Sequence, residues 1–179
     1  CSLDGARNGA TSPRKGRKTI MAYEFYVTVE GTKQGKFKGE SIREAHKEKV
    51  AGLRYQYEVS SPRDMATGQA SGKRQHGAIR FTKEWGAATP QFFQALVTNE
   101  VLKSVLFEFV RTSPEGVEEL HSTIRLTNAT VSSIEHSIGD TKQERAHDTQ
   151  ELETIAFTFQ RIEIENKLGK TAAADDWTK

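Results

Sequence analysis

The segment Thr89–Thr98, TPQFFQALVT, is the one stretch of this sequence that cannot form a β-strand. The Thr89 hydroxyl is expected to cap the free N–H groups of a first helical turn, and Pro90 suits the first helical position. Three apolar residues share one side of this helix and are predicted to be its core face: Phe92, Phe93 and Leu96. About three turns of helix are unstable alone in water, so packing against the rest of the chain must hold them.

Most of the remaining sequence alternates between apolar and polar residues, as half-buried β-strands do. The alternation begins near Tyr23, and a second strand is predicted from about Val50 to Ser60. The apolar residues of this second strand are expected to face the interior: Leu53, Tyr55, Tyr57 and Val59. Its polar residues face the other way: Arg54, Gln56 and Glu58. Later strands are predicted to start near Ile79, Val101, Leu120, Ala129 and Ile155.

Three details of the pattern favour a strongly curved sheet. The segment Val101–Val110 is apolar on both faces, which is typical of a central strand. The apolar phase slips at Ser132-Ser133, which predicts a β-bulge, and again near Gln160-Arg161, which predicts a bend. The fold class is therefore mainly β, a β-barrel of two curved sheets or a collapsed sandwich, with one short α-helix.

The segment Ser61–Gly77 carries glycines, one proline and four basic residues, with almost nothing apolar. It is too long for an ordinary hairpin loop. We expect it to be either disordered or ordered by a partner.

The whole sequence has 35% hydrophobic and 28% charged residues, a composition that favours one soluble domain, which we place over residues 21–179. Residues 1–20 lack periodicity and are predicted to be a disordered basic leader or tag before Met21. The alternatives for the leader are a lipoprotein terminus at Cys1 and nonspecific contact with nucleic acid. The formal net charge of the whole sequence is +2. Residues 1–20 contribute +4 of this, so the domain itself carries −2. Nucleic acid is therefore not expected as a partner of the folded part.

The sequence offers no recognisable catalytic, cofactor or metal site. Its five histidines lack metal-ligand spacing, and Cys1 is the only cysteine. The segment Gly68–Lys73 departs from a phosphate-binding loop in spacing, and no nucleophile elbow is present. No apolar run approaches the roughly 20 residues of a membrane span, so no membrane anchor is expected. Asn128 heads a glycosylation motif that matters only in a secretory pathway.

Several short segments occur in an order that resembles one known family. They are Gly39–Ser41, His46-Lys47, Ser61–Asp64, Thr67-Gly68, Gly72–His76, Thr82–Glu84, Thr89-Pro90, Ala95–Glu100, Leu126–Ala129, Phe157–Gln160 and Asp175–Trp177. Together they are similar to the Hcp (haemolysin-coregulated protein) family, the inner-tube proteins of bacterial type VI secretion systems. The resemblance covers roughly Met21 to Trp177. The sequence departs from the family pattern at Gly86, where an acidic residue is common, and this puts a helix-capping contact in doubt.

The resemblance implies a β-barrel of two sheets with one helix alongside. It also implies homohexameric rings that stack into a hollow tube inside a contractile sheath in the bacterial cytoplasm. Contraction would expel the tube, tipped by a spike protein, to the exterior or into a target cell, with effector cargo in the lumen. Some relatives carry a C-terminal toxin domain, which is not expected here because the sequence ends two residues after Trp177. Phage tail-tube proteins share this architecture and are the alternative.

The resemblance also suggests roles for two sets of residues. The ring-stacking loop would comprise Ser61, Pro62, Arg63, Asp64, Gly68, Gly72, Lys73, Arg74, Gln75 and His76. In the family the second strand lies in the sheet that faces the channel, so Arg54, Gln56 and Glu58 are predicted to line the lumen; the alternative is an ordinary solvated face. An enzyme and a soluble ligand-binding barrel remain the competing classes, and ring assembly would separate them from a tube subunit.

Overall fold

Strands make up most of the computed structural model, which describes residues 23–139 and 150–178. The predicted leader and nearly all of the polar connection after Ile138 lie outside the described residues. The elements are β1 (Tyr23–Gly31), a 3-10 turn (Glu44–His46), β2 (Val50–Gly52), β3 (Arg54–Gln56), β4 (Val59–Ser60), β5 (Gln75–His76), β6 (Ile79–Glu84), α1 (Thr89–Val97), β7 (Leu102–Thr112), β8 (Glu118–Ile138), β9 (Glu151–Thr158), β10 (Arg161–Asn166) and β11 (Thr171–Asp176).

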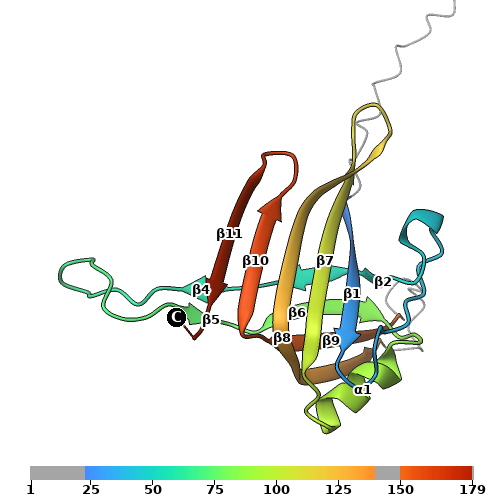
Figure 1. Cartoon of the computed structure of the whole chain (residues 1–179), viewed down its shortest axis with the longest axis horizontal. Helices are drawn as coiled ribbons and strands as arrows, with labels where there is room; N and C mark the ends of the chain where they lie inside the picture. The colour runs from blue at the N-terminus through green and yellow to red at the C-terminus, as the bar shows by residue number, and fades with distance from the viewer. Residues whose placement is uncertain (1–22, 140–149, 179) are drawn as a thin grey trace, which may run out of the picture.

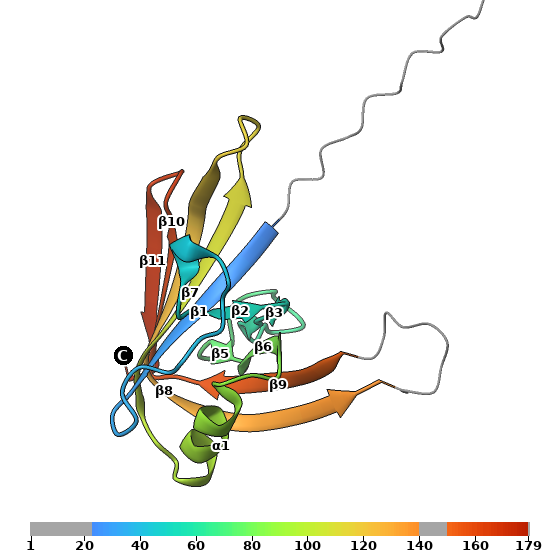
Figure 2. The same ribbon diagram turned by 90° about the vertical axis from the view of Figure 1, so that its right-hand side faces the viewer.

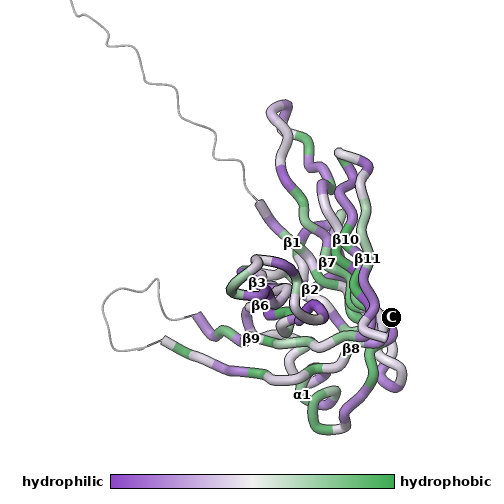
Figure 3. Tube along the Cα trace, turned by 90° about the vertical axis from the view of Figure 1, so that its left-hand side faces the viewer, coloured by the Kyte–Doolittle hydropathy of each residue, from purple (hydrophilic) through white to green (hydrophobic). Residues whose placement is uncertain are grey.

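Two curved sheets share the long strand β8 (Figures 1 and 2). The first part of β8 pairs with β7 on one side and β10 on the other, and β11 extends this first sheet beyond β10. The later part of β8 pairs with β9 in the second sheet, followed by β6 and β3. Hydrophobic and hydrophilic residues alternate along β8 and β9 (Figure 3), as one-sided burial requires.

Irregularities in β8 turn it from one sheet into the other. The sequence pattern suggested two strands here, whereas the structure has one strand with Asn128 in the left-handed region at φ 49°. The predicted bulge is confirmed, because the register with β9 shifts between Val131 and Ser133. The predicted bend is also confirmed: β9 ends at Thr158, β10 starts at Arg161, and the Gln160 N–H between them donates to the Thr127 carbonyl at 3.2 Å.

The mainly β fold with one α-helix is confirmed over the described residues, and among these residues no continuous ladder closes the sheets into a barrel. When the paired strands are followed from neighbour to neighbour through both sheets, the first is β2 and the last is β3. These two strands lie on either side of Leu53 in the sequence. At this point the backbone passes from the first sheet to the second, and the Leu53 N–H donates to the Thr82 carbonyl at 2.8 Å. The two sheets therefore curve around one core and are joined at their open side by the chain itself.

The predicted single strand Val50–Ser60 is wrong in two respects. It is broken into β2, β3 and β4, which pair with three different strands. Leu53 and Val59, which were expected in the interior, are 54% and 51% exposed because they lie where the chain changes pairing partner. Tyr55 and Tyr57 do pack against the core, as predicted.

The centre of the core is a group of fully buried phenylalanines, one on the inner face of α1 and three on the strands that it covers. They are Phe81, Phe92, Phe107 and Phe157. The rings of Phe81 and Phe157 stack with centroids 5.7 Å apart, and Phe92 contacts both at about that distance. Strand β7 lies between β1 and β8, which confirms it as a central strand.

Helix α1 forms where predicted, but its contacts differ in two ways. Its N-cap is Ala88, and the Thr89 hydroxyl instead accepts from the Gly86 N–H at 3.0 Å, so the predicted Thr89 cap is wrong. Phe92 is fully buried and Leu96 is half-buried, whereas Phe93 is 54% exposed. The buried face runs through Phe92, Ala95 and Leu96, and Phe93 lies about 100° around the helix from Phe92, outside this face.

Strand β11 was not predicted from the sequence. It contains three consecutive alanines, Ala172 to Ala174, and lacks an apolar-polar alternation. Among the strands of residues 23–139 and 150–178, it pairs only with β10, as an edge strand of the first sheet. Its register is set by the hairpin that joins it to β10, and an apolar-polar pattern gives no information about such pairing.

The helix face can be tested with a pair of truncations. Leu96→Ala is expected to cost about 2 kcal/mol of unfolding free energy, the low end for a leucine truncation, because this side chain is only half-buried. Phe93→Ala should cost about 1 kcal/mol or less. Urea unfolding of the two variants at one protein concentration makes the comparison. Equal losses would mean that the outer face of α1 is also covered, as expected if it forms a subunit contact.

Candidate assembly surfaces

A projecting arm, residues 61–77, leaves the body at the end of β4 and returns through β5 (Figure 1). The two strands pair through Val59 with His76 and Ser60 with Gln75. Further out, Arg63 bridges to Ala70, and the Ser71 N–H donates to the Pro62 carbonyl at 3.0 Å. The arm is therefore ordered by its own hydrogen bonds, so the expectation of disorder or of ordering by a partner is wrong.

Asp64 organises the tip of the arm. Its Oδ1 accepts the backbone N–H groups of Ala66 and Thr67, each at 2.8 Å, and its own N–H donates to the Gln69 carbonyl at 2.8 Å. The hydrogen bonds from Thr67 and Ala66 lower the pKa of Asp64, because they favour the charged carboxylate. Gly68 turns the chain at φ 71°, a conformation suited to glycine. The tip is thus preformed at neutral pH.

The predicted ring-stacking residues divide into exposed and anchored groups. The exposed ones are Ser61, Arg63, Asp64, Gly68, Gly72, Lys73 and Gln75. Pro62, Arg74 and His76 are partly buried. Arg74 and His76 lie at the base of the arm, where both contact Asp175 of β11. The structure therefore brings these ten residues into one arm, with most of its surface free for contact.

The Asp175 carboxylate is held in its charged form. Its pKa is lowered from 3.8 to about 2, chiefly by the hydrogen bond from Arg74 and also by that from His76. A lowered carboxyl pKa contributes stability that is complete above the unfolded value and is lost as pH falls through the folded one. This contact is therefore expected to persist at neutral pH and to weaken only between about pH 4 and pH 2.

A polar face covers the outer side of the second sheet. Arg54 and Gln56 are exposed on β3, as predicted, and Glu58 is exposed just beyond it. The face continues to β6 through Thr82, which pairs with Arg54, and to β9 through Thr154. The hydroxyls of Thr82 and Thr154 lie 2.9 Å apart. The three predicted lumen residues are thus part of a wider polar surface.

A buried ionic cluster fixes the start of α1 to the second sheet. The Lys83 ammonium and the Glu153 carboxylate lie 2.5 Å apart, with 3% and 0% of the side chains exposed. The Thr89 hydroxyl donates to Glu153 at 2.8 Å, and Lys83 also donates to the Glu84 carbonyl. Glu153 further contacts His136 at 3.1 Å. Each buried charge therefore has several partners, as buried charges require.

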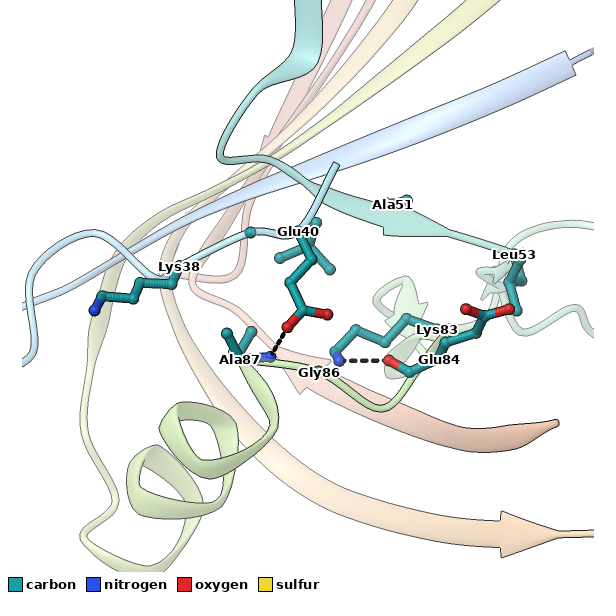
Figure 4. Close-up of a pocket in the computed structure, with 11 residues that line it drawn as sticks. Lys38, Glu40, Ala51, Leu53, Lys83, Glu84, Gly86 and Ala87 are labelled. Carbon is teal, nitrogen blue, oxygen red and sulfur yellow. Dashed lines mark hydrogen bonds between the residues drawn. The ribbon is translucent and has the colours of Figure 1, made fainter. Parts of the chain in front are cut away.

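The chain before α1 is supported from a distant segment (Figure 4). The Glu40 carboxylate accepts the Ala87 N–H at 2.6 Å, and its side chain points across Gly86. A Cβ atom on Gly86 would lie 2.0 Å from a Glu40 oxygen. The absence of a side chain at position 86 thus leaves room for Glu40. The contact holds the chain just before α1 but does not cap the helix, since Ala87 precedes the N-cap residue Ala88, which makes no side-chain cap hydrogen bond.

The contacts of Glu153, Glu40 and Asp175 were missed by sequence reasoning. The segments that carry Lys83, Thr89, Arg74 and His76 resemble the family, whereas Ala87 and His136 lie outside the family-like segments, and sequence alone assigned no pairing. Within residues 23–139 and 150–178, no cluster of three side chains is placed to hold a metal ion. Over the same residues, no helix has the length and apolar character to cross a bilayer.

Comparisons with known proteins agree on one family. The family model described as "Type VI secretion system effector, Hcp" matches residues 26–165. The "Major exported protein" of Pseudomonas aeruginosa is 31% identical over 167 residues, which cover 88% of this chain and 96% of that protein. A crystal structure of an Hcp protein superposes with a TM-score of 0.82 at 26% identity, covering 88% of this chain and 99% of the other. The secreted protein Hcp3 of Pseudomonas aeruginosa gives a TM-score of 0.71 at 27% identity, covering 87% and 99%.

Proposed function

Because this chain belongs to the Hcp family of type VI secretion proteins, we propose that it is a structural subunit of the type VI secretion inner tube. In this proposal it forms homohexameric rings in the bacterial cytoplasm, and the rings stack into a hollow tube within a contractile sheath. Contraction expels the tube behind a spike protein, with effectors carried in the lumen. The observation that carries the proposal beyond the family is the ordered arm, which lies outside both sheets.

The arm is suited to contact a second copy of the chain. It buries little apolar surface of its own, yet its tip is fixed by hydrogen bonds centred on Asp64. A preformed projection loses little conformational freedom on binding. Rings need contacts around an axis that close, and stacking needs a further element that reaches the next ring. We assign this second contact to the arm.

The polar face of the second sheet is suited to line a hydrated lumen. An apolar wall would expose a sticky surface to cargo and solvent, whereas Arg54, Gln56 and Thr82 present charges and hydrogen-bonding groups. The first sheet, with Lys103 on its outer side, would then face away from the channel. We infer no catalytic role for either surface.

Thiol labelling tests the assignment of the lumen. Gln56→Cys, in a Cys1→Ser background, is expected to react readily in open rings and slowly inside long tubes, because the reagent must diffuse in from the ends. Lys103→Cys is the matched exposed control on the first sheet and should react at similar rates in both states. Equal rates at Gln56→Cys in rings and tubes would place this residue on the outside.

A secretion assay tests the proposed function as a whole. In a bacterium with an active type VI system, the tagged protein should replace the resident tube protein and appear in the culture medium. Its appearance should be lost when the sheath cannot contract. Secretion that is independent of the sheath, or no rescue despite normal expression, would contradict a role as the tube subunit.

A further inference from the structure

The arm is joined to the body by very few backbone contacts. The β4–β5 ladder contains two residue pairs and is separate from both the first and the second sheet. One further hydrogen bond joins the Gly77 N–H to the Glu58 carbonyl at 2.9 Å. An isolated two-stranded hairpin is marginally stable in water. The direction in which the arm leaves the body must therefore depend on side-chain contacts at its base.

His76 is the centre of these contacts. Its side chain is 5% exposed, and both ring nitrogens have partners. The Nδ1 atom lies 2.6 Å from the Tyr57 hydroxyl, and the Nε2 atom lies 2.7 Å from an Asp175 oxygen. The ring packs against Phe159 and Trp177, with centroids 5.5 and 5.3 Å away. A side chain of the arm is thus enclosed by groups of the body.

Arg74 makes a second connection to the same place. Its Nε atom donates to the Asp175 carboxylate, and another guanidinium nitrogen donates to the Asp176 carbonyl at 2.6 Å. The Trp177 N–H in turn donates to the Gln160 carbonyl at 3.0 Å, at the bend between β9 and β10. The end of β11 is therefore tied both to the arm and to the point where the two sheets meet.

We propose that Asp175 and Trp177 are positioning residues that fix the direction of the arm, through a clamp made of Arg74, His76, Asp175 and Trp177. The clamp joins two segments about 100 residues apart, Gly72–His76 and Asp175–Trp177, which the sequence analysis singled out separately. The consequence for stacking rests on the proposed function, since an arm held in one direction meets its partner with less loss of freedom. The clamp itself is a property of the single chain.

The test measures the motion of the arm tip directly. A dye is attached at Met65→Cys, a fully exposed tip residue, in a Cys1→Ser background, and its time-resolved anisotropy is recorded before filaments grow. Asp175→Asn and Arg74→Gln should each increase the nanosecond segmental motion of the tip while ring mass and melting temperature stay near the parent values. The double variant should show less than the sum of the two single effects, because both changes break the shared contact between Arg74 and Asp175 while each also removes one contact of its own. Glu165→Gln is the control, since Glu165 lies on the neighbouring strand β10 and its exposed pair with Lys167 is remote from the clamp residues.

Tip motion decides the inference separately from stacking. Increased motion in Asp175→Asn and Arg74→Gln, with no change in Glu165→Gln, supports the clamp. Unchanged motion in both clamp variants, or an equal increase in the control, overturns it. Trp177→Phe provides a further check, because it keeps an aromatic ring against His76 and should leave the tip as rigid as in the parent. Filament counts on the same samples report on the proposed stacking role alone.

Discussion

Glu153→Ala is expected to lower the free energy of unfolding by about 3–5 kcal/mol, the usual cost of breaking a buried ion pair by removing one partner. The variant leaves the Lys83 ammonium buried without its counter-charge. It also removes the acceptor of the Thr89 hydroxyl, which anchors the first turn of α1. Urea denaturation followed by circular dichroism measures the loss, with all variants at the same concentration because assembly would add to apparent stability.

Two further variants separate this explanation from a general effect of losing a carboxylate. Glu163→Ala breaks an exposed pair with Arg161 and should cost about 1 kcal/mol or less. The double change Lys83→Met with Glu153→Leu removes both buried charges and should recover most of the stability, since apolar replacements of buried pairs are often neutral. A double variant as unstable as Glu153→Ala would mean that the cluster is needed for its hydrogen bonds rather than for charge balance.

Deletion of Thr67–Ser71 is expected to abolish filaments while leaving rings intact. The deletion removes the tip of the arm, including the Gly68 and Ser71 hydrogen bonds, but keeps the β4–β5 ladder and the clamp. Neither sheet loses a residue, so the fold and the ring contacts should survive. Light scattering reports ring mass, and electron microscopy reports filament number and length.

A replacement of the same five residues by a Gly-Ser sequence of equal length shows whether shape or length matters. It removes the Thr67 hydroxyl contact to Asp64 and makes the backbone of the tip more flexible, while keeping the reach of the arm. Loss of filaments in both variants would indicate that the preformed tip is required. Filaments of normal length in the deletion variant would assign stacking to another element.

Most helices, strands and bends could be predicted from the local sequence, because they depend on apolar periodicity and on the positions of Pro and Gly. The helix at Pro90, the bulge near Ser132 and the bend near Gln160 all leave marks within a few residues. The burial of Ala95 in place of Phe93 was not readable, since one small residue between larger ones gives an ambiguous helical face. Strand β11 was missed for a related reason: three consecutive alanines show no alternation of apolar and polar residues.

The side-chain contacts were not readable from the sequence, because they join residues far apart along the chain. Lys83 and Glu153 meet only because β6 and β9 are neighbours in the second sheet. His76 meets Asp175 because the arm leaves the body beside the end of β11. The family-like segments include Lys83, His76 and Asp175 but not Glu153. The pairing depends on how the strands are arranged in space, which local patterns do not determine.

The most direct test of the central claim, that this chain is a tube subunit, is negative-stain electron microscopy of the purified protein together with its mass by light scattering. We expect ring-shaped particles with a central opening and a mass six times the 20.0 kDa of the chain, stacking into hollow filaments as concentration rises. A stable monomer or dimer without rings, at concentrations where a matched Hcp protein assembles, would contradict the account.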